Sequence, residues 1–406
     1  MALVNKTFSD IITFTRASTA TFFNSAGVLT SAATNAPRFD YNPSTLAAQG
    51  LLIEESRTNS IRNNTMQGAV AGTPGTLPTN WTQVLPATGT FTREIVGTGT
   101  ENGITYIEIR YTGTPGASNN YQIYSEGFTT VAASSGQTWT GTLYAKLVGG
   151  SFAGISSLGL TVYERNSGGG FVAGSQTNIT PTSSALNTQR YTTTRTLTDA
   201  TTAAVQSGLI FAFTGAAIDI TLRIGLPQLE LGAFATSVIP TTTTALTRAA
   251  DVASVNTLSP WYNASAGTLY AQGILVGGTA GAFPYQASLV GSNANNDSIG
   301  VNWTAPNSNM RFGVRSGGVS QCDIPIIPSK VAGNTFKMAG RYANNDFQAS
   351  SDGNLGTPDT TGSLPTITAL SLGGPVSFQP GASVWLQRVT YYPRISSNAE
   401  LQALTV

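Results

Sequence analysis

The chain has 406 residues and a near-neutral charge balance, because 20 lysines and arginines face 19 aspartates and glutamates. Only 10% of its residues are charged, none is histidine, and Cys322 is the single cysteine. This composition excludes Ser-His-Asp and Cys-His nucleophile systems, histidine metal ligands, zinc–cysteine clusters and internal disulfides. We therefore expect a protein that acts through its surface and its assembly, that is not an enzyme, and that uses no cofactor or metal.

The weak charge also limits the partners that we expect. A charge-poor surface attracts phosphate backbones and anionic lipid headgroups only weakly, so we predict neither nucleic acid binding nor membrane insertion. No run approaches the roughly 20 apolar residues of a membrane span, and residues 1–18 lack the apolar core of a signal peptide. We expect synthesis in a host cytoplasm and release by lysis if the protein works outside the cell.

Along the chain, the pattern predicts an all-β fold with three segments. The first segment, residues 1–62, is expected to form a small N-terminal β module. It contains a predicted hairpin at 21–30, turning at 24–27, and a predicted strand at 50–54.

The other two segments are each expected to form a β-sandwich of the jelly-roll or lectin-like kind. In residues 63–252, Thr, Val, Ile, Tyr and Phe recur in short alternating runs that are typical of half-buried strands. The strand predictions in this segment are 104–111, 138–145, 208–213 and 218–224, and a linker is expected at 241–244. Residues 253–406 form the second predicted sandwich, which ends in a short helix with a capping box at Ser397 and Glu400.

Three N-terminal stretches, 14–21, 35–41 and 50–59, resemble in order and spacing the N-terminal module of tailed-bacteriophage fibre and spike proteins. Residues 227–241 are similar to the closing strand of the carbohydrate-binding-module-like jelly rolls of such proteins. Residues 388–394 are similar to the end of their concanavalin/laminin-G-like domains. The resemblance implies a virion-docking module at 1–62, a jelly roll at 63–252 and a lectin-like domain at 253–406.

This resemblance also implies a function. It points to a virion fibre or spike subunit that attaches the particle to its host, is located in the virion, and has other virion proteins and a host-surface glycan as partners. Many such fibres are homotrimers, so we expect a homotrimer. The matched positions imply a set of virion-docking residues, namely Phe14, Arg16, Arg38, Phe39, Glu54 and Arg57.

Two other functions remain open at this point. One is a virion-associated polysaccharide depolymerase, and the other is a head or collar decoration protein with no receptor role. The sequence leaves the position on the particle, whether head, collar or tail, undetermined. It also leaves the identity of any glycan open.

Aromatic side chains are the usual platform for sugars, although most aromatic residues in strands belong to the core. Trp303 lies beside Asn302 and a polar stretch at 304–307, so we predict that its ring faces a glycan, with Arg311 and Arg315 close enough in sequence to help. Tyr342 is predicted for the same site. The other aromatic candidates are Trp81, Tyr121, Tyr124, Trp139 and Tyr285, and for Trp139 core burial is the favoured interpretation.

Carboxylates are the remaining candidates for catalysis or for calcium. Glycoside hydrolysis usually needs two of them about 5–9.5 Å apart, whereas Glu54 and Glu55 are neighbours on a predicted strand and should face opposite ways. Asp346, Asp352 and Asp359 occur in Asn- and Gly-rich stretches, for which turn formation is favoured over calcium binding. Cys322 has no histidine to activate it and is predicted to be an inert thiol.

Overall fold

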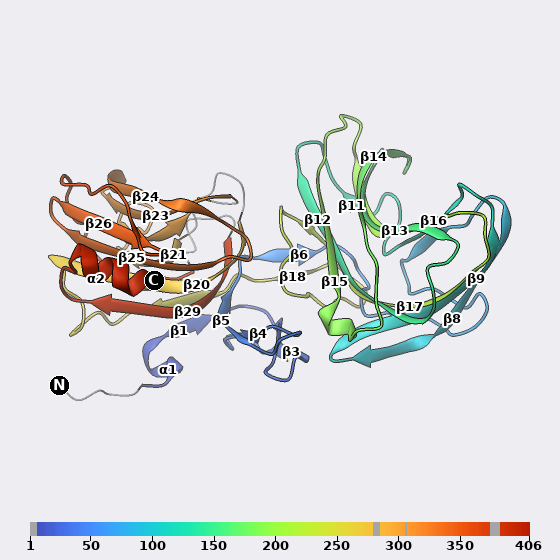
Figure 1. Ribbon diagram of the computed structural model, residues 1–406, viewed down its shortest axis with the longest axis horizontal. Helices are drawn as coiled ribbons and strands as arrows, with labels where there is room; N and C mark the ends of the chain where they lie inside the picture. Colours follow the sequence, from blue (N-terminus) through green and yellow to red (C-terminus); the bar gives the residue numbers. More distant parts are fainter. Residues whose placement is uncertain (1–5, 279–284, 305–306, 374–381) are drawn as a thin grey trace.

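The computed structural model describes residues 6–278, 285–304, 307–373 and 382–406, and nearly all of its regular structure is β. Figure 1 shows two β lobes side by side, joined by a narrow connection. This confirms the predicted all-β fold with two sandwiches. In the described part of the chain, no helix is both long and apolar enough to cross a membrane.

The first lobe contains two facing antiparallel sheets. One sheet has the order β14 (Phe171–Asn178), β13 (Ile155–Arg165), β16 (Ala204–Phe213), β10 (Asn120–Tyr124) and β7 (Thr82–Val84), with β11 (Val131–Ala132) also paired to β16. The other has the order β15 (Arg190–Thr196), β12 (Thr138–Gly150), β17 (Ile218–Leu231), β9 (Ile104–Pro115) and β8 (Gly89–Glu101), and the short 3-10 helix η1 (Leu186–Thr188) precedes β15.

The strand alternation predicted from the sequence explains the core of this lobe. In β9, Ile107, Ile109 and Tyr111 are buried while Glu108 and Arg110 face outward, as a period of two requires. The inward side chains meet those of the facing sheet, such as Leu160 and Phe211, in one core cluster. Trp139 is 5% exposed and packs in a neighbouring cluster, which confirms the core interpretation for that residue.

The second lobe is also a two-sheet sandwich. Its first sheet has the order β1 (Thr13–Thr15), β19 (Val252–Val255), β28 (Ala369–Leu372), β21 (Tyr285–Val290), β22 (Ser298–Trp303), β23 (Asn307–Ser316) and β24 (Val319–Val331). Its second sheet has the order β27 (Asn354–Leu355), β26 (Asp346–Ser351), β25 (Thr335–Ala343), β20 (Ala266–Gly278), β29 (Ala382–Tyr392), β5 (Ala48–Ile53) and β4 (Phe39–Tyr41).

The chain closes with helix α2 (Asn398–Thr405), which lies on β25 and β26. Its predicted capping box is present, because the Ser397 hydroxyl accepts from the Glu400 N–H while the Glu400 carboxylate accepts from the Ser397 N–H. Leu401 is fully buried beneath the helix and anchors it to the sheet.

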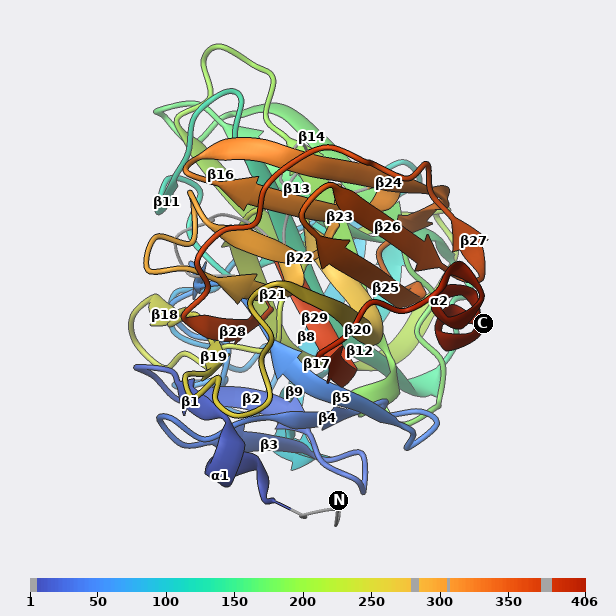
Figure 2. The same ribbon diagram turned by 90° about the vertical axis from the view of Figure 1, so that its left-hand side faces the viewer.

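The N-terminal segment differs from the separate compact module that we expected for residues 1–62. Strand β1 pairs with β19, and β5 pairs with β29, so these strands extend both sheets of the second lobe. Figure 2 shows β4 and β5 beside β29 and β20. The physical reason is that short strands leave unpaired backbone groups, and the open edges of the second sandwich satisfy them. The first lobe is therefore an insertion between two parts of the second.

The remaining N-terminal elements are helix α1 (Phe8–Ile11) and the antiparallel hairpin of β2 (Ala20–Phe23) and β3 (Leu29–Ala32). The hairpin turns where the sequence predicts, because Gly27 adopts a φ of 71° and the Asn24 side-chain oxygen accepts from the N–H groups of Ala26 and Val28. Strands β6 (Arg57–Asn59) and β18 (Leu246–Arg248) pair with each other between the lobes (Figure 1).

The predicted linker at 241–244 is anchored at its first residue. Thr241 is buried, donates its N–H to the Asn64 side chain at 2.7 Å, and donates its hydroxyl to the Ile61 carbonyl at 2.7 Å. The segment that leaves the first lobe at Thr241 is thus hydrogen-bonded to the segment that enters it at residues 61–64.

Candidate functional site

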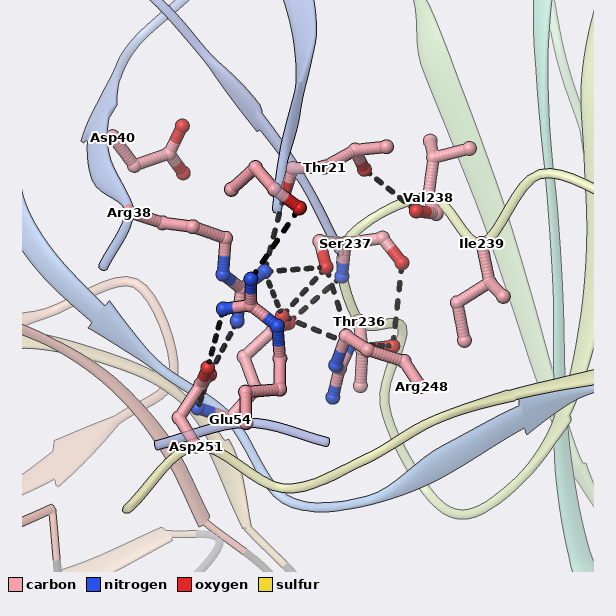
Figure 3. Close-up of polar contacts among 12 residues, drawn as sticks. Thr21, Arg38, Asp40, Glu54, Thr236, Ser237, Val238, Ile239, Arg248 and Asp251 are labelled. Carbon is pink, nitrogen blue, oxygen red and sulfur yellow. Dashed lines mark hydrogen bonds and ion pairs between the residues drawn. The ribbon is translucent and has the colours of Figure 1, made fainter. Parts of the chain in front are cut away.

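Three of the six residues predicted to dock on a virion, Arg16, Arg38 and Glu54, meet inside the protein. Figure 3 shows Arg38 and Glu54 there, beside Arg248 and Asp251. Arg38 is completely buried and lies between two carboxylates, donating to Glu54 at 2.7 Å and to Asp251. Arg16 reaches the other oxygen of Asp251 at 3.0 Å. We call Arg16, Arg38, Glu54, Arg248 and Asp251 the junction network.

Glu54 is the acceptor at the centre of this network. Burial alone disfavours its charged form, but Arg248 at 2.9 Å, Arg38, and the N–H and hydroxyl of Ser237 outweigh that cost and lower the pKa of Glu54 to about 2. Glu54 is therefore negatively charged at neutral pH, and its carboxylate is paired with Arg38 and Arg248 within the junction network.

Arg57 is also committed to internal contacts. Its guanidinium donates to Glu55 and to the Leu231 carbonyl, and it lies 4.6 Å from the ring centre of Phe234. Glu54 and Glu55 bind different arginines and form no catalytic pair, but they follow the end of β5 at Ile53 and do not lie on a strand as predicted.

The predicted docking surface therefore needs correction at most of its positions. Arg16, Arg38, Glu54 and Arg57 are buried because each carries a charge that finds its partner inside the protein. Phe14 is also buried, in the core of the second lobe. Phe39 alone in that set is exposed, at 46%, and its ring stacks edge-on against Phe8.

A cavity of about 320 Å³ adjoins the junction and is bordered by all three segments. Its walls include Tyr144 and Trp385, and its buried carboxylates are Asp40 and Glu54. Asp40 accepts from the Phe23 N–H at 2.7 Å and from Trp385 Nε1 at 2.9 Å, so both of its oxygens are occupied. Burial raises the pKa of Asp40, and these two donors act against that rise.

The late acidic residues lie in turns and ion pairs. Asp346 binds Arg341 at 3.0 Å, Asp352 binds Lys330, and Asp359 accepts from the N–H and hydroxyl of Thr361. Within the described residues, no group of His, Cys, Asp and Glu has the arrangement of a metal site. The turn interpretation of these stretches fits the positive φ of Asp352, which is 48°.

The glycan-facing prediction is wrong for Trp303 and for Tyr342. Both are completely buried in the core of the second lobe. Trp303 follows Ile299 and Val301 on the inner face of β22, and its Nε1 donates to the Lys330 carbonyl at 3.1 Å. Tyr342 makes a 2.9 Å hydroxyl contact with Tyr391. Of the polar stretch that motivated the Trp303 prediction, residues 305–306 lie outside the described residues.

The other three predicted residues, Asn302, Arg311 and Arg315, do come together. They line a cavity of about 290 Å³ on the outer face of the first sheet of the second lobe. We call this cavity the sheet-face recess. Because strand neighbours alternate between faces, Asn302 points outward where Trp303 points inward. Tyr285, one of the other aromatic candidates, also lines the recess. The recess residues that the sequence did not single out are Gly313, Ser320 and Asp323, with Val314 and Cys322 contributing from beneath.

Strand register fixes the layout of the recess. In β23, Arg311, Gly313 and Arg315 occupy alternate positions, so they share the outer face. Asn302 is the register partner of Arg311 on one side, and Asp323 is the partner of Gly313 on the other. The spacing Arg-x-Gly-x-Arg is the sequence signal that could have identified this face once 307–316 was taken as a strand.

Glycines form the floor of the recess. A methyl group added at Gly313 would lie 3.1 Å from Asn302 Nδ2 and 3.6 Å from the Tyr285 hydroxyl. At Gly300, which pairs with Gly313, an added methyl would come within 2.7 Å of the Tyr285 ring. The absence of side chains at these two positions lets the Tyr285 ring lie across β22 and lets the Asn302 amide, which hydrogen-bonds the Tyr285 hydroxyl, approach Gly313 closely.

The polar atoms of the recess differ in whether they have hydrogen-bond partners. Arg311 is held by an ion pair to Asp323, whose side chain is 49% exposed. Arg315 donates Nε to the Asn295 carbonyl at 3.1 Å and Nη2 to the Gly318 carbonyl. Asn302 is only 6% exposed, yet its Oδ1 accepts no hydrogen bond within the described part of the chain.

Two groups beside the recess are kept neutral by burial. Burial raises the pKa of the Tyr285 hydroxyl, which contacts the Ser298 hydroxyl at 3.1 Å. Burial, with Asp359 and Asp323 nearby, also raises the pKa of the Cys322 thiol, as expected for an inert cysteine.

Comparison with known proteins gives limited information. No protein-family model and no curated relative matches the chain. Among solved structures, the CBM40 domain of the Ruminococcus gnavus IT-sialidase, bound to α2,3-sialyllactose, is similar at 17% identity over 36% of this chain and 84% of its own, with a TM-score of 0.28.

Two further structures align over more of the chain. The tandem CBM22 domains of Paenibacillus barcinonensis Xyn10C cover 86% of this chain and 99% of their own at 12% identity, with a TM-score of 0.23. Mouse laminin alpha1 domains LG4-5 cover 65% and 86% at 12% identity, with a TM-score of 0.22. At such TM-scores the alignments carry no argument about function, and the site must be judged on its own geometry.

Proposed function

We propose that the protein is a glycan-binding, non-catalytic component of a bacteriophage virion, and that the sheet-face recess is where it holds the glycan. The observation that carries this proposal is the recess itself, a cavity of about 290 Å³ whose lining includes Arg311, Arg315 and Asp323. Its wall also holds Asn302 Oδ1, a buried acceptor that has no donor within the described residues. A buried polar atom left unpaired costs about 1–3 kcal/mol. Less than 1 Å² of this oxygen is exposed, so a ligand donor recovers that cost only if the Asn302 side chain turns toward the recess.

A carbohydrate fits the mixture of groups around Asn302. Sugar hydroxyls both donate and accept, so they can use the donors of Arg315 and the accepting oxygens of Asp323. The apolar C–H face of a pyranose can lie on the glycine floor beside the Tyr285 ring. Ligand sites commonly combine such an apolar surface with a few fixed polar groups.

The recess supports binding better than hydrolysis. Asp323 is the one carboxylate that lines it, and this group is already paired with Arg311. A glycosidase normally places two carboxyl groups across the scissile bond. No observation therefore favours the depolymerase alternative over a binding role.

The virion role is supported by the resemblance of stretches 14–21, 35–41 and 50–59 to phage fibre and spike proteins. We propose a homotrimer located in the particle, with other virion proteins as partners. Three copies of a weak site would raise the apparent affinity for a surface glycan by roughly 10²–10⁴-fold.

Array binding of the full chain tests the glycan proposal. We expect the wild-type protein to bind a subset of bacterial surface glycans, and the Arg315→Gln variant to lose that binding. Arg388→Gln is the matched control, because Arg388 is exposed on β29, in the opposite sheet of the same sandwich. Equal binding by both variants, or no binding by the wild type to any glycan, would contradict the proposal.

The virion role needs a separate test. Peptides of the chain are expected in purified particles of the virus that encodes it, and the purified protein is expected to have the native mass of a trimer. Absence from washed particles would contradict the particle location, and a monomeric mass at virion-like concentration would contradict the trimer.

A further inference from the structure

We infer that the cavity of about 320 Å³ between the lobes is a second ligand site, which holds a single neutral sugar residue. We call it the inter-lobe cavity. It shares no lining residue with the sheet-face recess, so this site goes beyond the proposed function and does not depend on it. Three features support it: aromatic rings from both lobes, a hydroxyl without a partner, and charged groups that are already bound within the protein.

The walls of the inter-lobe cavity come from the outer faces of two sheets in different lobes. On β12, both strand neighbours of Tyr144 enter the core of the first lobe, so Tyr144 points outward. On β29, both neighbours of Trp385 enter the core of the second lobe, so Trp385 points outward as well. Strand alternation thus brings one aromatic side chain from each lobe to the same cavity.

The hairpin of β2 and β3 adds apolar surface to the cavity through Phe22, Phe23 and Leu29. Aromatic and aliphatic side chains of this kind can cover the C–H face of a pyranose ring. The volume of about 320 Å³ lies at the lower end of the roughly 300–1,000 Å³ of small-molecule sites, which often form between domains. We therefore expect the cavity to hold one sugar ring.

The Tyr144 hydroxyl is the group in this cavity that is left for a ligand. Tyr144 is only 1% exposed, and its hydroxyl has no hydrogen-bond partner in the part of the chain that the structure describes. Unlike Asn302 Oδ1, this oxygen is not among the described unpartnered atoms with less than 1 Å² exposed, so it borders the open space of the cavity. Burial raises the pKa of Tyr144, which keeps the hydroxyl neutral and able both to donate and to accept.

The charged groups that border the cavity favour a neutral ligand, because each is already bound within the protein. The carboxylates of Asp40 and Glu54 hold the donors described above. The guanidinium of Arg190 donates to a backbone carbonyl at 2.8 Å and to a threonine hydroxyl at 3.1 Å. A charged ligand would lose its hydration here without gaining an unbound counter-charge, which is more costly than burying a sugar hydroxyl.

Fluorine NMR on the full chain labelled with 5-fluorotryptophan tests this site. The chain has five tryptophans, all in the described residues, and Trp385 is the one that borders the cavity. Trp385→Phe identifies its signal. The probes are glucose, galactose, mannose and rhamnose, with glucuronic acid and glucosamine as charged analogues of glucose. We expect a neutral probe to shift the Trp385 signal to saturation, and the charged probes to bind at least about tenfold more weakly.

A matched pair of tyrosine variants tests the role of the hydroxyl. Tyr144→Phe keeps the ring and is expected to weaken binding of the neutral probe about tenfold, since it removes one hydrogen bond to the ligand. Tyr111→Phe is the control, because Tyr111 is equally buried in the core of the first lobe and does not border the cavity. The control should bind the probe as the wild type does.

Four outcomes would overturn this inference: no shift of the Trp385 signal with any neutral probe, a shift confined to another tryptophan, equal binding of charged and neutral probes, or unchanged binding in Tyr144→Phe. These outcomes leave the proposed function intact, since the array tests that function through Arg315→Gln. If Arg315→Gln removes monosaccharide binding and Tyr144→Phe does not, the sugar is held in the sheet-face recess and the inter-lobe site fails. Loss of array binding in Arg315→Gln with an unchanged Trp385 response supports two separate sites.

Discussion

The junction network and the sheet-face recess both gather arginines and carboxylates on β strands, but they differ in how those groups are compensated. In the junction network, Arg16, Arg38 and Arg248 each bind a buried carboxylate, and Glu54 accepts from several donors. In the recess, Asn302 is a neutral amide whose buried oxygen has no donor among the residues that the structure describes.

The comparison separates a structural site from the proposed binding site. The junction also leaves Arg38 Nε and Arg248 Nε without hydrogen-bond partners, but each guanidinium is held by an opposite charge that belongs to the protein. Removing one partner there exposes a buried charge, whereas changing Asn302 removes an atom that was never satisfied. We therefore expect substitutions in the junction network to lower the free energy of unfolding. We expect substitutions in the sheet-face recess to weaken ligand binding with little change in stability.

The largest effect is expected from Glu54→Gln in the junction network. The substitution removes the anion between Arg38 and Arg248, and breaking a buried ion pair in this way costs about 3–5 kcal/mol. Urea unfolding followed by tryptophan fluorescence measures the loss. An exposed ion pair contributes at most about 1 kcal/mol to the free energy of unfolding. A loss in Glu54→Gln no larger than that would contradict the structural role of this network.

Acid should reproduce part of that loss. The pKa of Glu54 lies at about 2 in the folded protein against 4.5 for the free side chain, so its stabilisation is complete above pH 4.5 and declines as the pH falls toward 2. The difference corresponds to about 3 kcal/mol. The urea midpoints of wild type and Glu54→Gln should differ at pH 7 and should differ less at pH 3. An equal difference at both pH values would contradict this assignment.

Asn302→Leu sharpens the comparison from the side of the recess. The Asn302 amide makes a hydrogen bond to Tyr285, while its Oδ1 has no donor within the described residues. Replacing it by an apolar group of similar size is expected to change the free energy of unfolding by about 1 kcal/mol, the contribution of that one hydrogen bond. Glycan binding should be lost in the same variant. A destabilisation as large as that of Glu54→Gln would mean that Asn302 belongs to the architecture and not to a binding site.

The smallest effect is expected at an exposed ion pair. Arg110 and Asp219 lie 2.8 Å apart on the first lobe, and their side chains are 45% and 54% exposed. Asp219→Asn should cost less than about 1 kcal/mol, because solvent screens such pairs. This variant is also the charge-removal control for Glu54→Gln, and an equal loss in both would remove the distinction between buried and exposed pairs.

Local features of the fold could be predicted from the sequence. The strand at 104–111, the hairpin at 21–30 and the cap at Ser397 each depend on residues that are near one another in the chain. Short-range alternation and turn chemistry determine such features, so one stretch of sequence is enough to identify them.

Long-range pairing could not be predicted in this way. Arg38 and Asp251 are 213 residues apart, and nothing near either of them indicates the other. The partners of β1 and β5 are equally distant, which is why residues 1–62 were expected to stand alone. The recess is an intermediate case. The sequence correctly predicts that Asn302, Arg311 and Arg315 lie together. It wrongly predicts Trp303 at the same site, because strand neighbours point to opposite faces of a sheet.

The paired strands β6 and β18 have a mechanical consequence. The chain crosses from one lobe to the other twice, and the two crossings run antiparallel as a ribbon in which Arg57 is opposite Arg248. Both arginines are anchored to acidic or carbonyl groups on the lobes they connect. A tensile load applied between the lobes is therefore shared by two backbones, and one proteolytic nick in either crossing leaves the lobes covalently attached.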